Sequence, residues 1–250
     1  MREWYEEAFG RDYLILYRHR NEREAEEDVN AIVGLIDPPR DLPLLDLACG
    51  AGRHLIALHR AGYRSLVGID LSEELLKVAR TRIQEEGCEG VRLIRADMRE
   101  IPFSEYFGTV LSLFTSFGYF EERKDDEAVV AAVHSALLPG GLFLIDTLAR
   151  ERTRANLVPH EERRIGEKRV IITRRISPDG ERVEKVIRFI SPDGDERSYR
   201  ESVRLYTADR LTGLFRDAGF INVKAYGSLT GRSYDENAER LIAVGRKEKR

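Results

Sequence analysis

The apolar positions of this chain follow two different spacings, and segments of the two kinds alternate along the sequence. Between residues 22 and 36 apolar side chains recur every three or four positions, which predicts an amphipathic helix that ends before Pro38 and Pro39. The expected strands that follow are 44–47, 65–69, 91–95, 109–113 and 142–147, and the expected helices begin after Gly52 and cover 73–86 and 126–138. Strict alternation of strand and helix predicts βαβ units and a parallel sheet.

The spacing changes in the later part of the chain. Residues 168–206 contain three β-rich runs separated by two near-copies of one turn, ISPDGE and ISPDGD, in which proline presets φ and glycine accepts a positive φ. These residues therefore predict an antiparallel meander. After it, Thr207 is suited to cap a helix that stops at Gly219, and two last strands at 221–226 and 240–246 complete the main sheet.

The charged residues are balanced in sign and dispersed along the chain. The 41 basic and 44 acidic residues give a formal net charge of −3, so no general field attracts nucleic acid or an anionic membrane. The N-terminal residues lack the apolar core of a secretory signal, and no run approaches the roughly 20 apolar residues of a membrane span. Cys49 and Cys88 have neither a disulfide framework nor a metal-binding spacing. We therefore expect a cytoplasmic protein with no metal, no membrane partner and no nucleic-acid partner.

The stretch LLDLACGAGRHL, residues 44–55, contains the first candidate site. Gly50 and Gly52 close the first turn from strand to helix, where missing side chains let a ligand approach the backbone and the free N–H groups of the helix. A dinucleotide-binding turn has a third glycine, at the position of Leu55 here. Asp46 places a carboxylate before the turn, which repels a pyrophosphate and favours an ammonium or sulfonium group. We therefore expect a positively charged ligand above these glycines.

Two further acids follow the next two strands. Asp70 ends the second strand 18 residues after Gly52, where a carboxylate can accept both hydroxyls of a ribose. Asp97 follows the third strand and is placed to accept from an exocyclic amine, and the adjacent Met98 can pack on a purine. Each acid alone is also ordinary turn or cap chemistry. Their joint placement favours one binding crevice, because parallel strands end at the same edge of a sheet.

Taken together, these motifs resemble the class I S-adenosylmethionine-dependent methyltransferases. LLDLACGAGRH is similar to their first motif, LVGIDLS to the second with its ribose acid, RADM to the adenine-binding segment and LPGGLFLID to the turn into the fifth strand. The resemblance implies S-adenosylmethionine as cofactor and an α/β three-layer sandwich with a seven-stranded, mostly parallel sheet whose last strand is antiparallel. The cofactor-binding residues that we expect from it are Asp46, Ala48, Gly50, Gly52, Asp70, Leu71, Asp97, Met98 and Phe114.

The same resemblance suggests how the chain is divided. We expect an N-terminal helical cap at 1–40, a cofactor-binding core at 41–150 and 207–250, and an antiparallel β insertion at 151–206 that acts as a lid. The stretch LFTSFGYF, residues 113–120, together with the late insertion, further resembles the small-molecule branch that includes amino-sugar N-methyltransferases.

The loop after the fourth strand is the expected place for contacts with the methyl acceptor. Thr115, Ser116 and Tyr119 supply hydroxyls there, and Phe117 supplies a ring. An active-site histidine of the amino-sugar relatives aligns with Tyr119, so this chain departs from them where the acceptor is handled. Tyr119 is therefore the candidate catalytic residue, with the role of orienting the acceptor.

Further candidate contacts come from other parts of the chain. His54 begins the helix after the glycines and is expected at the rim of the site, while Arg232 and Tyr234 lie in a long loop between the last two strands. With Tyr13, these complete the expected substrate-binding set of Tyr13, His54, Thr115, Ser116, Phe117, Tyr119, Arg232 and Tyr234. The aromatic residues suited to a flap over the cofactor are Trp4, Tyr5, Phe9, Tyr13 and Tyr17. The arginines of the meander, which face either an anionic acceptor or solvent, are Arg174, Arg175, Arg188, Arg197 and Arg204.

Three other functions compete with methyl transfer to a small-molecule nitrogen or oxygen. A nucleic-acid methyltransferase is disfavoured because the fourth strand is not followed by an Asn/Asp-Pro-Pro-aromatic tetrad and no Pro-Cys nucleophile occurs. A nicotinamide-dependent oxidoreductase is disfavoured by Asp46 and the missing third glycine. A non-catalytic adenosylmethionine-binding or scaffold protein stays open, as does the choice between monomer and homodimer.

Overall fold

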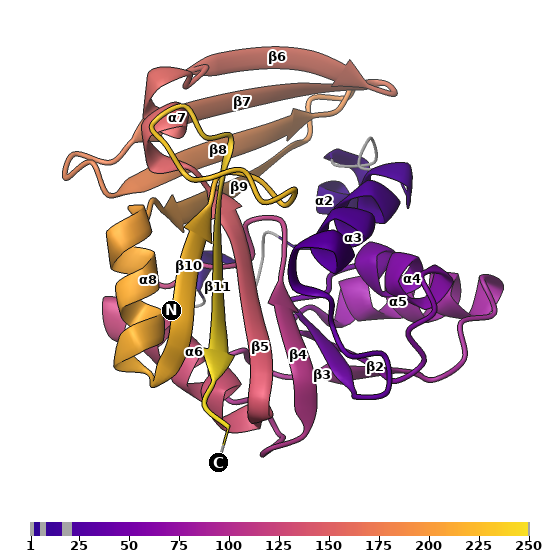
Figure 1. Cartoon of the computed structure of the whole chain (residues 1–250). Helices are drawn as coiled ribbons and strands as arrows, with labels where there is room; N and C mark the ends of the chain where they lie inside the picture. The colour runs from indigo at the N-terminus through magenta and orange to yellow at the C-terminus, as the bar shows by residue number, and fades with distance from the viewer. Residues whose placement is uncertain (1–2, 6–8, 17–21, 250) are drawn as a thin grey trace.

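The computed structural model describes residues 3–5, 9–16 and 22–249. Its strands form a seven-stranded sheet and a separate four-stranded sheet, labelled in Figure 1. The strands of the larger sheet are β1 (Leu44–Leu47), β2 (Leu66–Asp70), β3 (Val91–Arg95), β4 (Phe107–Ser112), β5 (Leu137–Leu148), β10 (Phe220–Tyr226) and β11 (Arg240–Lys247). The smaller sheet consists of β6 (His160–Ile165), β7 (Lys168–Ile176), β8 (Arg182–Ile190) and β9 (Glu196–Arg204).

Most of the helices cover the faces of the larger sheet. The helices are α2 (Arg11–Leu16), α3 (Glu22–Ile36), α4 (Arg53–Arg60), α5 (Glu73–Glu85), α6 (Arg123–Ala136), α7 (Arg150–Ala155) and α8 (Ala208–Asp217). The Thr207 hydroxyl accepts from the Arg210 N–H and caps α8, as the sequence predicts. The expected helix over residues 22–36 is confirmed as α3.

The order of the larger sheet is β10-β11-β5-β4-β1-β2-β3. Strand β11 runs antiparallel to β5 and β10, and the other neighbouring pairs are parallel. This confirms the expected fold class, including its antiparallel last strand. The chain leaves β1 toward β2 on one side and returns through β4 on the other, so the ends of β1 and β4 flank the point where strand order reverses. A ligand of an open α/β sheet binds at such a point.

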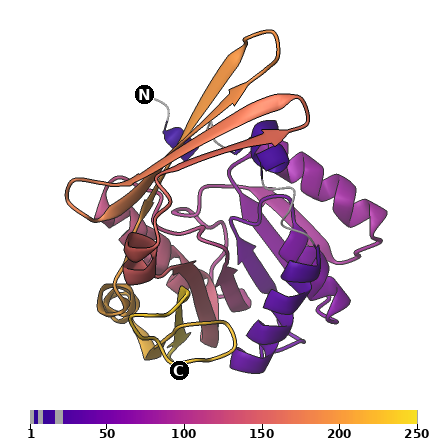
Figure 2. The ribbon, with the colours of Figure 1, turned by 90° about the horizontal axis from the view of Figure 1, so that it is seen from above.

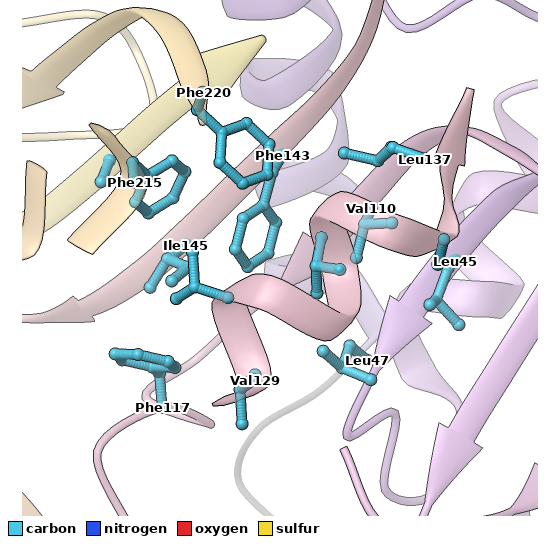
Figure 3. Close-up of a cluster of buried hydrophobic side chains, with 14 of the residues drawn as sticks. Leu45, Leu47, Val110, Phe117, Val129, Leu137, Phe143, Ile145, Phe215 and Phe220 are labelled. Carbon is cyan, nitrogen blue, oxygen red and sulfur yellow. The ribbon is translucent and has the colours of Figure 1, made fainter. Parts of the chain in front are cut away.

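Both faces of the larger sheet are covered by apolar side chains of the helices. On one face, Val129 of α6 and Phe215 of α8 lie in one buried cluster with strand residues such as Phe143. Figure 3 shows this cluster, in which the Phe143 and Phe215 rings stack with centroids 4.9 Å apart. Helices α3, α4 and α5 supply the cluster on the other face. Burial on both faces explains why these strands are almost continuously apolar.

The four-stranded sheet lies across one end of the larger sheet (Figures 1 and 2). Leu16 of α2 is buried in a small cluster with Val170 and Phe189 of this sheet. The Tyr199 hydroxyl donates to Asp12 Oδ2 over 2.7 Å. The N-terminal segment is therefore held against the four-stranded sheet by both apolar and polar contacts.

Several sequence predictions need correction. The three strands expected within residues 168–206 are confirmed as β7, β8 and β9, but the small sheet has a fourth strand, β6. Its sequence HEERRI has too few apolar residues to show a strand pattern. Helix α7 was also missed, since its sequence RERTRA places no buried side chain. Helix α6 begins at Arg123, three residues before the expected start, and β5 begins at Leu137 and includes the LPGG turn that was expected to precede it.

Candidate active site

Three adjoining cavities lie where β1, β2 and β4 end. Cavity A is lined by the ends of β2 and β3 and by N-terminal aromatic side chains. Cavity B, of about 590 Å³, lies beside the glycine turn. Cavity C, of about 510 Å³, lies between the turn after β4 and the inner face of the four-stranded sheet. Tyr13 lines all three cavities, so they adjoin one another at this side chain.

The turn after β1 brings its backbone to cavities A and B. Ala48 and Gly50 have positive φ values of 61° and 55° and line both cavities. The Gly50 N–H donates to Asp70 Oδ2 over 2.8 Å, which ties this turn to the end of β2. Gly52 lines none of the three cavities. A Cβ there would come within 3.2 Å of the Ala79 Cβ, so this glycine allows α5 to pack closely against the turn.

Asp46 is a buried carboxylate at the end of β1 and lines cavity B. Asp46 is 1 % exposed. Within the described part of the chain its Oδ2 has no hydrogen-bond partner. Burial raises the pKa of Asp46 to about 7. The positive charge of Arg53 lowers this pKa, and the negative charge of Asp70 raises it further. An unpartnered buried carboxylate is costly, so this position favours a ligand that brings a positive charge.

Asp70 and Asp97 both line cavity A, with Leu71 and Met98 beside them. Asp70 accepts from two backbone groups, the Ser72 N–H at Oδ1 and the Gly50 N–H at Oδ2, each over 2.8 Å. Burial nonetheless raises the pKa of Asp70. The three acids expected to share a crevice are thus brought to two adjoining cavities.

Asp97 is held by the side chain of Arg99. Burial works against the charged form of Asp97, but hydrogen bonds from the Arg99 side chain and backbone lower its pKa below the ordinary value. The Arg99 Nη2 donates to Asp97 Oδ2 over 2.7 Å. The guanidinium also lies over the ring of Phe120, 4.4 Å from its centroid. The Asp97 carboxylate is therefore ionised, and its bonds with Arg99 fix its orientation.

The loop after β4 separates the cavities. Phe114 lines cavities B and C, Thr115 lines C, Ser116 lines A and B, and Tyr119 lines A and C. Phe117 lines none of them. It is 1 % exposed and packs in the core beside Tyr206, with ring centroids 5.6 Å apart. The aromatic ring expected to meet the acceptor at position 117 is thus directed into the protein.

Aromatic side chains of the N-terminal segment cover the site. Tyr5, Phe9 and Tyr13 line cavity A, and Trp4 lines cavity C. The Tyr119 ring lies against Trp4 and Phe9, with centroid separations of 5.2 and 5.5 Å. Tyr17, which was expected in the same flap, lies outside the described residues.

His54, Arg232 and Tyr234 occupy places that the sequence did not indicate. His54 lines cavity B but is buried, not on a rim, and its Nε2 lies 3.2 Å from Asp28 Oδ2. Burial lowers the pKa of His54. Arg232 pairs with Asp235 over 2.7 Å, and Tyr234 donates to Glu151 over 2.7 Å. Neither Arg232 nor Tyr234 lines cavity A, B or C.

The charged side chains of cavity C occur as pairs. Arg174 of the meander donates to Glu161 over 2.7 Å, and Lys185 donates to Glu201 over 3.1 Å. Arg240 is bound to Asp146. Arg175, Arg188 and Arg197 pair with acids on the four-stranded sheet, and Arg204 is buried against Asp126. Of the meander arginines expected to face an acceptor, Arg174 is the one that lines cavity C.

Sequence reasoning missed four charged residues that shape the site. They are Arg53, Asp146, Arg182 and Arg240. Asp146 ends the motif LPGGLFLID, so its place at the end of a strand was a usable signal. The other three are arginines whose positions depend on distant partners, and nothing local in the sequence marks them.

Two general properties bear on the kind of site. Among the residues that the structure describes, no group of three or more His, Cys, Asp or Glu side chains is arranged to hold a metal ion. Within the same residues, no helix combines the length and apolar character needed to cross a membrane.

Comparison with known proteins agrees with the fold and the motifs. Residues 44–141 match the family model described as a methyltransferase domain. This match covers less than half of the chain, and it agrees, as do the sheet order and the late antiparallel sheet, with the resemblance to class I S-adenosylmethionine-dependent methyltransferases that the sequence motifs indicate. The matched segment contains the glycine turn and the three acids on which the expected resemblance rests.

One curated relative shares part of its sequence with this chain. Over 108 residues the chain is 33 % identical to the dTDP-3-amino-3,4,6-trideoxy-alpha-D-glucopyranose N,N-dimethyltransferase of Streptomyces venezuelae, a match that covers 43 % of each chain. The matched segment thus spans less than half the length of this curated relative.

Solved structures extend the likeness in fold to nearly the whole chain. An S-adenosylmethionine-dependent methyltransferase from Clostridium acetobutylicum has a TM-score of 0.76 at 17 % identity, over 94 % of this chain and 96 % of that one. An amino pentose methyltransferase from Micromonospora echinaspora, solved with S-adenosylmethionine, has a TM-score of 0.67 at 24 % identity, over 95 % and 97 %. These likenesses concern the fold.

Proposed function

We propose that this protein transfers the methyl group of S-adenosylmethionine to nitrogen or oxygen of a small-molecule acceptor. The observation that carries this proposal is the buried Asp46 carboxylate, whose Oδ2 has no hydrogen-bond partner within the described residues and which lines cavity B. A cationic ligand relieves the cost of burying that group. The family match over residues 44–141 supports the same reading.

The cofactor residues follow from the cavities that they line. We assign the adenosine part to cavity A, with Asp70 at the ribose and Leu71, Asp97 and Met98 around the base. The amino-acid part is assigned to cavity B, where Asp46 faces its ammonium group. The backbone of Ala48 and Gly50 is assigned to contact both parts of the cofactor, and Phe114 lines the amino-acid part in cavity B. Gly52 contributes indirectly, because it allows α5 to pack against the turn. When bound, the cofactor supplies an electrophilic methyl group on a sulfonium.

The acceptor is assigned to cavity C. Its volume of about 510 Å³ lies within the range of roughly 300–1,000 Å³ that small-molecule sites occupy. We propose that the insertion 151–206 covers this cavity as a lid on the core of residues 41–150 and 207–250, with residues 1–40 as the cap. Thr115 and Tyr119 line cavity C and are the proposed contacts for orienting the acceptor.

A nitrogen acceptor is favoured by the aromatic boundary between the cavities. Phe9, Tyr13 and Tyr119 line both A and C, and Phe114 lines both B and C. Aromatic faces stabilise a cation, so they suit the positively charged ammonium that forms when an amine is methylated. A neutral amine also needs no general base to attack, and positioning alone supplies much of the acceleration. The Streptomyces relative carries N,N-dimethyltransferase in its name.

Calorimetric titration with S-adenosylmethionine, S-adenosylhomocysteine and NADH tests the cofactor assignment. Binding of the first two in the micromolar range, without binding of NADH, is expected. Binding of NADH alone would overturn the assignment of Asp46.

An acceptor screen then tests turnover, with matched amines and hydroxyl compounds and release of S-adenosylhomocysteine as the signal. Turnover of amines is expected. Tight cofactor binding without turnover of any acceptor would overturn the enzymatic part of the proposal and leave a binding protein.

A further inference from the structure

The turn after β4 contains two consecutive residues in a left-handed backbone conformation, and neither is glycine. Phe114 has φ 58° and Thr115 has φ 65°. Side chains disfavour this region, and a β-branched residue such as Thr is a genuine outlier there. Such strain persists only where the surrounding structure holds it, and it concentrates at functional sites.

Asp146, near the end of β5, holds both residues. Its Oδ2 accepts from the Phe114 N–H over 3.0 Å, and its backbone carbonyl accepts from the Thr115 N–H over 2.9 Å. Asp146 is 5 % exposed, so these bonds are shielded from water. The strained turn is therefore anchored on a strand of the central sheet.

Arg240, at the start of β11, completes the support. Its Nε donates to Asp146 Oδ1 over 2.7 Å, and its Nη2 donates to Thr115 Oγ1 over 3.2 Å. The Arg240 guanidinium also lies 5.5 Å from the centroid of the Phe114 ring, and that of Arg53 lies 4.7 Å from the same centroid. The ring is therefore fixed as well as the backbone.

The strained turn lies between cavities B and C. Phe114 lines cavity B on one side and cavity C on the other, and Thr115 lines cavity C. The turn is thus the wall between the proposed amino-acid end of the cofactor and the proposed acceptor.

We propose that Asp146 and Arg240 are positioning residues that hold the strained Phe114–Thr115 turn as the wall between cavities B and C. This rests on the proposed function. It predicts that loss of the support disturbs ligands that reach cavity B and spares ligands confined to cavity A.

The test compares two probes by calorimetry, S-adenosylhomocysteine and 5′-methylthioadenosine, which lacks the amino-acid part. In Asp146→Asn we expect the Kd of S-adenosylhomocysteine to rise at least about tenfold, equivalent to roughly 1.4 kcal/mol. The Kd of methylthioadenosine should change by less than about twofold, since cavity A is intact. Arg240→Lys, at a partly exposed position, should give the same pattern more weakly and provides the test if Asp146→Asn fails to fold.

A second substitution distinguishes backbone strain at Thr115 from a general loss of structure. Asn adopts left-handed backbone more readily than Thr, so Thr115→Asn in the Asp146→Asn background should restore much of the affinity for S-adenosylhomocysteine. The matched control is Asn222→Thr. Asn222 is exposed, has φ 53° and lies in β10, so this change introduces the same strain elsewhere. It should lower the Tm and leave both Kd values unchanged.

Three results would overturn the proposal. They are equal weakening of both probes in Asp146→Asn, unchanged affinity for S-adenosylhomocysteine, and no rescue by Thr115→Asn. Failure of the wild-type protein to bind either probe would instead overturn the proposed function, and this inference with it.

Discussion

At the scale of single residues, Asp46 combines burial with a pKa raised to about 7, against an ordinary value of 3.8. Between these two values the folded protein holds a proton that the unfolded chain releases, so the free energy of unfolding falls as pH rises from about 4 to about 7. We expect this fall to be smaller in Asp46→Asn. Urea denaturation across that range, without ligand, measures the difference between the two proteins.

The control for this experiment is Asp193→Asn, at an exposed acid in a turn of the four-stranded sheet. Its pH profile should follow the wild type. An unchanged difference between wild type and Asp46→Asn from pH 4 to pH 7 would contradict the environment described for Asp46.

Asp70 gives a second test at this scale. Asp70→Ala removes the acceptor of the Gly50 and Ser72 N–H groups as well as the proposed ribose ligand. Each hydrogen bond to a charged group contributes about 1.5–3 kcal/mol. Loss of the proposed bonds from Asp70 to the ribose should therefore lower the affinity for the cofactor by roughly tenfold or more. Calorimetry with S-adenosylhomocysteine measures it, and circular dichroism checks that the fold is kept. An unchanged Kd would remove Asp70 from the ribose role.

At the scale of elements, the four-stranded sheet is coupled to the loop after β4 by Arg182. From the start of β8, Arg182 donates to the carbonyls of Gly118, Tyr119 and Phe120 over 2.9–3.1 Å. Its Nε also donates to Ser202 Oγ over 2.7 Å. The sheet that covers cavity C thereby holds the backbone that carries Tyr119.

Arg182→Gln should loosen this connection. Carbonyls left without donors in a half-buried site cost free energy, and we expect the free energy of unfolding to fall by roughly 2–4 kcal/mol. Arg175→Gln is the matched control, because Arg175 is exposed on the same sheet and pairs with Glu184. Its effect should stay within about 0.5 kcal/mol. Equal effects of the two variants in urea denaturation would contradict the coupling.

At the scale of the whole molecule, cavities A and B are built from strand ends, the glycine turn and the N-terminal segment together. A ligand in them stabilises the folded chain by about 2.7 kcal/mol at 100 times its Kd. For a chain of this size that corresponds to a rise in Tm of roughly 5–10 °C. Thermal denaturation with S-adenosylhomocysteine should show this rise, and an equal concentration of NADH should not.

Asp46, Asp70 and Asp97 could be grouped from the sequence because each follows a parallel strand, and such strands end at one edge. Phe117 could not be placed in this way. Thr115 and Phe117 lie in the same loop, yet one lines cavity C and the other is buried in the core, because contacts with Asp146 and Tyr206 direct them.

Arg204 shows the same limit for charged residues. It stands between the apolar residues Val203 and Leu205, an alternation typical of a strand position that faces solvent, yet it is 7 % exposed and bound to Asp126 Oδ2 over 3.1 Å. Its partner is distant in the sequence, so no local pattern reports the contact. Strand β6 was missed for a related reason, since its pairing with β7 makes it a strand despite its charged composition.

The sequence by itself determined the alternating strands and helices of the central sheet and the glycine turn with its acids. These properties depend on local periodicity and turn chemistry, which neighbouring residues specify. Only the tertiary structure decided which loop side chains face a cavity, which arginines are buried and how the Phe114–Thr115 turn is held. Those outcomes depend on partners far away in the chain, such as Asp146 and Arg240, whose proximity exists only once the sheet has formed.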